Sequence, residues 1–260
     1  MYAELCSLSY RDEFEAVDKL TIFIGYPRSG HSLIGSLLDA LPHVVISHEL
    51  NALNYVRQGF SKASLYYLIL RQSRRFTHKG AQQAGYKYTV PGQFNGTFVS
   101  PLRVIGDKKG GASSEIILNN PTILDQLARV VDQPVKVIHV ARHPLDNIST
   151  ISRKHGKTPR EAADFYFKLC EAVQWSEERI DDDDWLDVWL EDVIADSKGS
   201  MRDMCAFLGE EGGDDYLAAC DEKIFDTPNL SRNKIEWPEG LVESIGERAR
   251  EIPYLARYSF

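Results

Sequence analysis

The chain has 260 residues, of which 43% are hydrophobic and 26% charged, and its formal net charge is −8. This composition is typical of a soluble globular protein with a sizeable core, and the length favours a single domain over residues 1–260. The negative charge argues against a general nucleic-acid or anionic-membrane surface, but a local basic pocket can still bind a small anion.

Targeting and membrane signals are missing from the sequence. Residues 1–20 contain no basic segment followed by an apolar core, so they do not resemble a signal peptide. No apolar run reaches the length of about 18 residues that a transmembrane helix needs. The cysteines show neither a CxxC pair nor a histidine at metal-ligand spacing, which predicts reduced thiols. We therefore expect a cytoplasmic protein, although a lumenal protein without its leader would show the same pattern.

The first predicted unit is a strand, a turn with two glycines, and a helix. An apolar run at Leu20–Ile24 predicts a buried strand, and the turn 25–32 follows it. Apolar residues at helical spacing from Leu33 to Leu41 then predict a helix. Such a unit directs several backbone N–H groups and a helix N-terminus towards one phosphate.

The turn departs from the common phosphate-loop template in an informative way. It matches G-x-x-x-x-G-K-[ST] at both glycines and at Ser32, but His31 replaces the lysine and the cation stands earlier, at Arg28. A nucleoside triphosphatase uses that lysine on the β- and γ-phosphates, so its absence disfavours an Mg-ATP site. The loop suits a diphosphate-like group without a metal; a turn that binds no ligand is the alternative.

Short apolar runs and helical patterns continue to alternate along the chain. Further strands are expected at residues 44–46, 103–106, 135–141 and 185–190. Further helices are expected from near Glu49, Lys62, Asn120, Pro144, Pro159, Met201 and Gly240, and residues 84–102 are expected to form an irregular loop or small hairpin. The helix after Thr158 carries a capping-box signal, with Glu161 three residues later.

This alternation is typical of right-handed βαβ units. It predicts a three-layer α/β/α fold with a mainly parallel central sheet of the phosphate-loop type. Ligands of such folds bind beyond the carboxyl ends of the strands. We therefore expect the residues that follow Ile24, Ile105, Ala141 and Leu190 to converge on one site.

A second anion site is predicted where the strand 135–141 ends. Arg142 offers a two-pronged donor for phosphate, and Ser149 and Thr150 lie about two helical turns further on and add hydroxyl donors. The alternative is that Arg142 forms a surface ion pair with Asp146, one turn later.

A basic loop late in this acidic chain is a further candidate for the same phosphate. It contains Ser231, Arg232 and Lys234. Two separate anion sites fit a nucleotide that carries an extra phosphate on its ribose. The donor 3′-phosphoadenosine 5′-phosphosulfate (PAPS), whose product is adenosine 3′,5′-bisphosphate (PAP), has this arrangement.

Taken in order, these motifs resemble those of the PAPS-dependent sulfotransferase family. Residues 26–32 resemble the family's 5′-phosphosulfate loop, and Arg142 with Thr150 eight residues later resembles its 3′-phosphate motif. Residues 189–209 are similar to its strand-Glu-Asp-helix element, and residues 231–237 to its late phosphate-covering loop. That loop lacks the RKG-x-x-G form of the cytosolic small-molecule branch, so the resemblance is closer to the tyrosylprotein, carbohydrate and bacterial branches.

The resemblance implies metal-independent transfer of a sulfuryl group from PAPS to an acceptor hydroxyl, and it suggests roles for individual residues. Glu49 corresponds to the base of those branches, although a carboxylate there also suits a helix N-terminus. His48 and His31 are rival bases. Lys108 and Arg28 would stabilise the leaving oxygen, and simple solvation is one reading of the adjacent Lys109. Donor contacts are implied at Arg28, Ser29, Gly30, His31, Ser32, Arg142, Ser149, Thr150, Ser231, Arg232 and Lys234.

Two other functions fit parts of the sequence. One is a P-loop kinase or ATPase acting on a small molecule, and the other is a nucleotide-binding module without catalytic activity. The expected acceptor is a free hydroxyl of a carbohydrate, a phenol or tyrosine, or another small molecule. Aromatic residues in the segment 86–98 could stack on its ring, or could serve only as packing.

Overall fold

The computed structural model describes residues 2–83 and 85–260. Five parallel strands form the central sheet in the order β2-β5-β1-β6-β7. Their bounds are β1 (Lys19–Ile24), β2 (Val44–His48), β5 (Val104–Lys108), β6 (Val135–Ala141) and β7 (Trp185–Trp189). Strand β1 lies in the middle and is almost wholly buried, as its apolar sequence requires of a strand covered on both faces.

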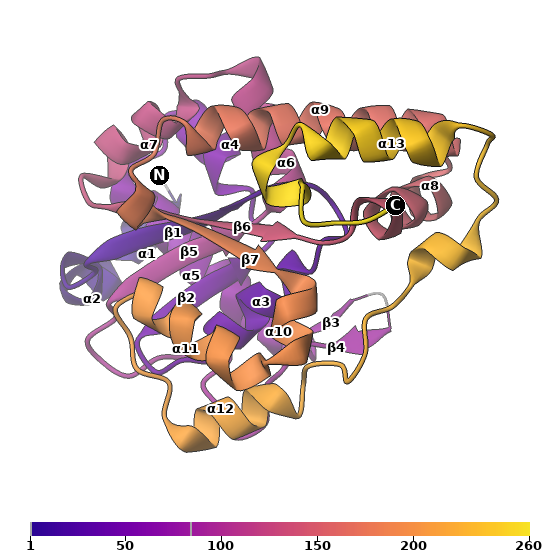
Figure 1. Ribbon diagram of the computed structural model, residues 1–260. Helices are drawn as coiled ribbons and strands as arrows, with labels where there is room; N and C mark the ends of the chain where they lie inside the picture. Colours follow the sequence, from indigo (N-terminus) through magenta and orange to yellow (C-terminus); the bar gives the residue numbers. More distant parts are fainter. Residues whose placement is uncertain (1, 84) are drawn as a thin grey trace.

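Helices cover both faces of this sheet (Figure 1). One face carries α3 (His31–Leu38), α10 (Leu190–Ala195), α11 (Ser197–Phe207) and α12 (Asp214–Asp221). The other carries α4 (Ala52–Arg57), α6 (Gly110–Asn119), α7 (Ile123–Val131), α8 (Pro144–His155), α9 (Pro159–Glu177) and α13 (Leu241–Arg250). Alternate residues of β1 supply the two cores, with Ile22 and Ile24 on one side and Phe23 on the other. The predicted three-layer α/β/α fold is confirmed.

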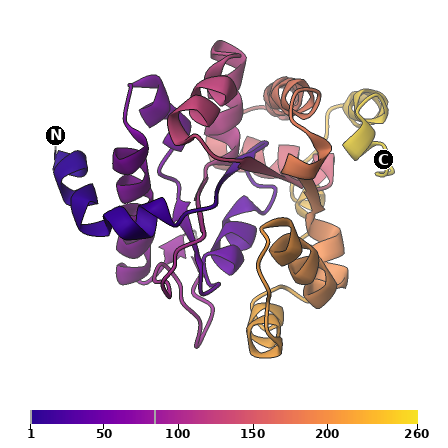
Figure 2. The ribbon, with the colours of Figure 1, turned by 90° about the vertical axis from the view of Figure 1, so that its left-hand side faces the viewer.

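The remaining elements lie at the margins of the sheet. Helix α5 (Lys62–His78) packs against β2, and the short N-terminal helices α1 (Tyr2–Ser7) and α2 (Arg11–Glu15) pack against α5. Figure 2 shows the N-terminal helix on the opposite side of the molecule from the C-terminus. Among the described residues, no helix has the length and apolarity needed to cross a bilayer.

Several expectations about local structure need correction or refinement. The helix expected from Glu49 begins at Ala52, because Glu49 and Asn51 both adopt positive φ, at 61° and 69°. Helices α1, α2, α6 and α12 were not predicted, and α11 begins at Ser197 rather than at Met201. The segment 84–102, expected as an irregular loop or small hairpin, contributes β4 (Tyr86–Lys87), which pairs antiparallel with β3 (Gln82–Gln83) before it; Ala84 lies outside the described residues.

Candidate functional site

A cavity of about 510 Å³ lies where the parallel strands end. Its lining includes Arg28 after β1, Lys108–Ala112 at the end of β5, Arg142 after β6 and Leu190 after β7. The predicted convergence of these four segments is therefore confirmed. Seven of the residues singled out from the sequence line the cavity: Arg28, Gly30, His31, Ser32, Glu49, Lys108 and Arg142.

The turn after β1 is held in shape by its own side chains. His31 Nε2 lies 3.2 Å from the Ile24 carbonyl and donates to it, which leaves Nδ1 to accept from the Ser29 hydroxyl at 2.8 Å. Burial lowers the pKa of His31 to about 3. The imidazole is therefore neutral, and with both nitrogens bonded within the loop it has a structural role rather than that of a base.

The same turn presents donors to the cavity. Arg28 has φ of 73° and Gly30 has φ of 111°, and α3 begins directly afterwards at His31. Helix geometry leaves the backbone N–H groups of His31 and Ser32 without intrahelical acceptors. Positive φ at a non-glycine residue is uncommon and occurs preferentially at ligand sites.

Lys108 lies between the loop helix and Glu49. Its Nζ donates to Ser32 Oγ at 2.9 Å and to Glu49 Oε1 at 3.0 Å. The stem of the side chain packs against α3 at Gly35, where an added Cβ would lie 2.9 Å from Lys108 Cβ, so glycine makes this close approach possible. Burial lowers the pKa of Lys108 to about 8, although Glu49 opposes the shift.

Glu49 is held by two lysines. Lys108 binds one carboxylate oxygen, and Lys109 Nζ donates to the other, Oε2, at 3.3 Å. Burial would raise the pKa of Glu49, but the two lysines outweigh this effect and lower the pKa to about 2. Lys109, which could have been simply solvated, thus forms an ion pair with Glu49.

Asp107 fixes the backbone that carries Glu49. This buried carboxylate accepts from Ser47 Oγ at 2.6 Å and from the N–H groups of Leu50 at 2.9 Å and Ala52 at 2.8 Å. It thereby caps α4 from a neighbouring strand and holds the turn that projects Glu49 into the cavity. No local sequence pattern predicts this role of Asp107, because its partners lie more than fifty residues away.

His48, the other rival base, serves the hairpin. Its Nε2 lies 2.6 Å from Gln83 Oε1, and its ring stacks on Phe76 with centroids 3.8 Å apart. Burial lowers the pKa of His48 to about 4. His48 is not among the described residues that line the 510 Å³ cavity, whereas Glu49 is.

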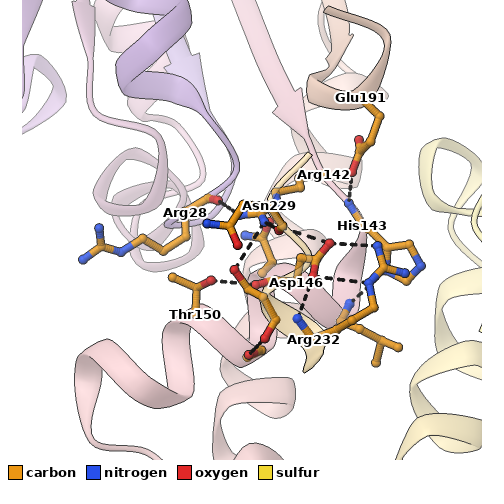
Figure 3. Close-up of polar contacts among 12 residues, drawn as sticks. Arg28, Arg142, His143, Asp146, Thr150, Glu191, Asn229 and Arg232 are labelled. Carbon is orange, nitrogen blue, oxygen red and sulfur yellow. Dashed lines mark hydrogen bonds and ion pairs between the residues drawn. The ribbon is translucent and has the colours of Figure 1, made fainter. Parts of the chain in front are cut away.

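Arg142 directly follows β6 and lines the cavity. Figure 3 shows its polar contacts. Its guanidinium donates to the backbone carbonyls of Arg28, at 3.4 Å, and of Asn229. The alternative pairing with Asp146 is present only as a long contact of 3.9 Å. Asp146 instead binds Arg232, through Nη2 at 2.8 Å and through the backbone N–H at 2.7 Å.

The other anion ligands predicted around Arg142 are not among the described residues that line the cavity. Ser149 is buried and donates to the Ser231 carbonyl at 2.5 Å, while Thr150 donates within its helix to the Asp146 carbonyl at 2.8 Å. Lys234 Nζ donates to Asn229 Oδ1 at 2.9 Å. The structure thus brings the basic loop beside Arg142, as expected, but these side chains are engaged with protein groups.

A further contact fixes the backbone next to Arg142. Glu191 accepts from the His143 N–H at 2.9 Å (Figure 3) and from the Tyr258 hydroxyl at 2.9 Å. Tyr258 comes from the C-terminal segment, so three distant parts of the chain meet here. Glu191 belongs to the family-like segment 189–209, but these contacts could not be predicted from that segment alone.

A family model described as the sulfotransferase family matches residues 21–215, which is most of the chain. The chain belongs to the sulfotransferase family. This membership supports sulfuryl transfer as its class of reaction. No curated protein sequence matches the chain closely enough to count as a relative.

Solved structures resemble this sulfotransferase over nearly its whole length. The sulfotransferase domain of a Synechococcus olefin synthase has a TM-score of 0.60 at 16% identity, covering 94% of this chain and 96% of that one. A sulfotransferase from Mycobacterium avium has 0.55 at 13% identity, with 99% and 81% covered. A mouse sulfotransferase complexed with PAP has 0.52 at 13% identity, with 95% and 93% covered. At these identities the likeness shows the fold.

Proposed function

We propose that this sulfotransferase transfers the sulfuryl group of PAPS to an acceptor hydroxyl, without a metal and with Glu49 as general base. The observation that carries the proposal is the chain of contacts from Ser32 of the phosphate loop through Lys108 to Glu49. It joins a site for an anionic donor to a carboxylate that faces the same cavity. The PAP in the mouse structure makes the same choice of nucleotide reasonable here.

The residues present fit such a donor. The N–H groups of His31 and Ser32 and the side chain of Arg28 suit the 5′-phosphosulfate. Arg142 suits the 3′-phosphate, because its guanidinium already binds carbonyl oxygens in the cavity wall and a phosphate oxygen is a stronger acceptor. In this proposal Ser149, Thr150, Ser231, Arg232 and Lys234 support Arg142, while Ser29 supports the loop.

Each catalytic residue has a distinct task in the proposed transfer. When bound, PAPS supplies the sulfuryl group: a bond forms between the acceptor oxygen and sulfur, and the bond from sulfur to the oxygen of the 5′-phosphate breaks. Glu49 takes the proton of the acceptor hydroxyl. Lys108 and Arg28 stabilise the negative charge that develops on the departing 5′-phosphate.

The direct test is release of PAP from PAPS in the presence of a mixed set of phenol and sugar acceptors, with EDTA present. Glu49→Gln keeps the size of the side chain but removes the base. We expect kcat to fall by about 10²- to 10⁴-fold while PAP affinity changes little. Full activity of the variant would contradict the role of Glu49, and Mg-dependent phosphoryl transfer from ATP would favour the kinase alternative.

A further inference from the structure

The two lysines on Glu49 differ in what else they contact. Lys108 bonds both Glu49 Oε1, at 3.0 Å, and Ser32 of the donor loop, at 2.9 Å. Lys109 Nζ donates to the other carboxylate oxygen of Glu49, Oε2, at 3.3 Å. Among the described residues, Glu49 is the one ion-pair partner that Lys109 has. The chain of contacts therefore runs from the donor loop to Lys109.

Exposure separates the two lysines as well. The Lys108 side chain is 3% exposed and is confined between α3 and Glu49, whereas the Lys109 side chain is 30% exposed and lines the open cavity. Lys109 can therefore leave Glu49 without disturbing the core, but Lys108 cannot.

Lys109 is the cation of the cavity to which the proposed donor site assigns no contact. The lining holds the cations Arg28, Lys108, Lys109 and Arg142 and, among the described residues, Glu49 as the one carboxylate. The proposed donor contacts use Arg28, Lys108 and Arg142, whereas Lys109 contacts Glu49. Several of the remaining lining residues are uncharged, and they include Gln83, Tyr86, Tyr88 and Phe225.

A base held by two cations is a weak proton acceptor near neutral pH, since its pKa lies far below the working pH. Loss of one cation from the carboxylate would strengthen it as a base. An anionic group on the acceptor, close to the reacting hydroxyl, would attract Lys109 away from Glu49 and so produce this effect when the right substrate binds.

This reasoning rests on the proposed sulfuryl transfer and names its substrate class. We propose that Lys109 selects acceptors that carry a carboxylate, sulfate or phosphate beside the reacting hydroxyl, by exchanging its contact with Glu49 for that group. Lys109 is thus a specificity-determining residue, and the aromatic residues of the cavity pack against the uncharged part of the acceptor.

The test compares kcat/KM for matched acceptors that differ in charge, such as 2-hydroxyphenylacetate and its methyl ester, or a glucuronide and its methyl ester. We expect the wild-type enzyme to prefer the acidic member by about tenfold or more. Lys109→Met should bring that ratio close to one and should increase transfer to the neutral member, because Glu49 is then a stronger base. Lys79→Met removes a lysine on the exposed surface and serves as the matched control.

Equal rates with both members of each pair, or a preference that survives in Lys109→Met, would overturn the proposal. Absence of transfer to every acidic acceptor would overturn it too. Calorimetric titration with PAP separates these results from a failure of the proposed function. If the wild-type protein binds PAP, the proposed donor site is retained and only the role of Lys109 is contradicted. If the wild-type protein does not bind PAP, both the proposed sulfuryl transfer and the role of Lys109 are contradicted.

Discussion

Replacing Arg142 tests the assignment of the 3′-phosphate site most sharply, because the donor's two anionic ends can be examined separately. PAP carries both phosphates, whereas AMP lacks the 3′-phosphate. The structure places Arg142 at the end of β6 and Arg28 at the end of β1. We therefore expect Arg142→Ala to weaken PAP binding and to leave AMP binding nearly unchanged.

The size of the effect follows from the contacts of the guanidinium. A hydrogen bond to a charged group contributes about 1.5–3 kcal/mol, and truncation also removes the present bonds to the Arg28 and Asn229 carbonyls. The loss of PAP affinity should therefore be about 10- to 150-fold, which corresponds to that energy range. Arg142→Lys keeps the charge but loses the planar guanidinium, so its PAP affinity should lie between those of Arg142→Ala and the wild type.

Isothermal titration calorimetry with PAP and with AMP measures both affinities on the same protein. The folded state should survive the substitution, since Asp146 retains Arg232 as its nearer partner at 2.8 Å. An equal loss of affinity for PAP and AMP would refute the reasoning, because it would show a general disturbance of the site. Unchanged affinity for PAP would place the 3′-phosphate elsewhere.

Three further predictions concern Lys108 and the supporting residues. With the pKa of Lys108 at about 8, kcat/KM for PAPS should fall above about pH 8 as the lysine loses its proton. In a pH-rate profile, Lys108→Arg should move this fall in kcat/KM to higher pH. Asp107→Asn turns an acceptor of three bonds into a partial donor; unfolding in urea should show a loss of about 2 kcal/mol, accompanied by lower kcat. Tyr258→Phe frees Glu191 from one donor and should weaken PAP binding about fivefold with AMP unaffected, as judged by calorimetry.

The parts of the fold that could be predicted are those encoded by local patterns. The run Val135–Ala141 became β6 with the same bounds, because a short apolar segment between turn residues has few alternatives in an α/β chain. The capping box at Thr158 and Glu161 is present as expected, with both reciprocal bonds formed. The phosphate-loop unit was predictable for the same reason.

The parts that were missed depend on tertiary contacts. Gly110 and Gly111 disfavour a helix locally, yet α6 begins there. The helix packs directly on the loop, and an added Cβ at Gly110 would lie 2.5 Å from the His31 ring, so this close approach requires glycine. The start of α4 moved to Ala52 because Asp107 holds the preceding turn. The contact of Lys109 with Glu49 joins residues sixty positions apart, so no local pattern reports it.

The account depends above all on the identity of the nucleotide. Thermal unfolding with PAP, ADP and AMP, each without Mg²⁺, compares them directly. At about 100 times its dissociation constant a ligand adds roughly 2.7 kcal/mol, which should raise Tm by about 5–10 °C for a chain of this size. We predict such a shift with PAP at concentrations where ADP and AMP produce much less; equal shifts with all three nucleotides, or a larger one with ADP, would contradict the assignment.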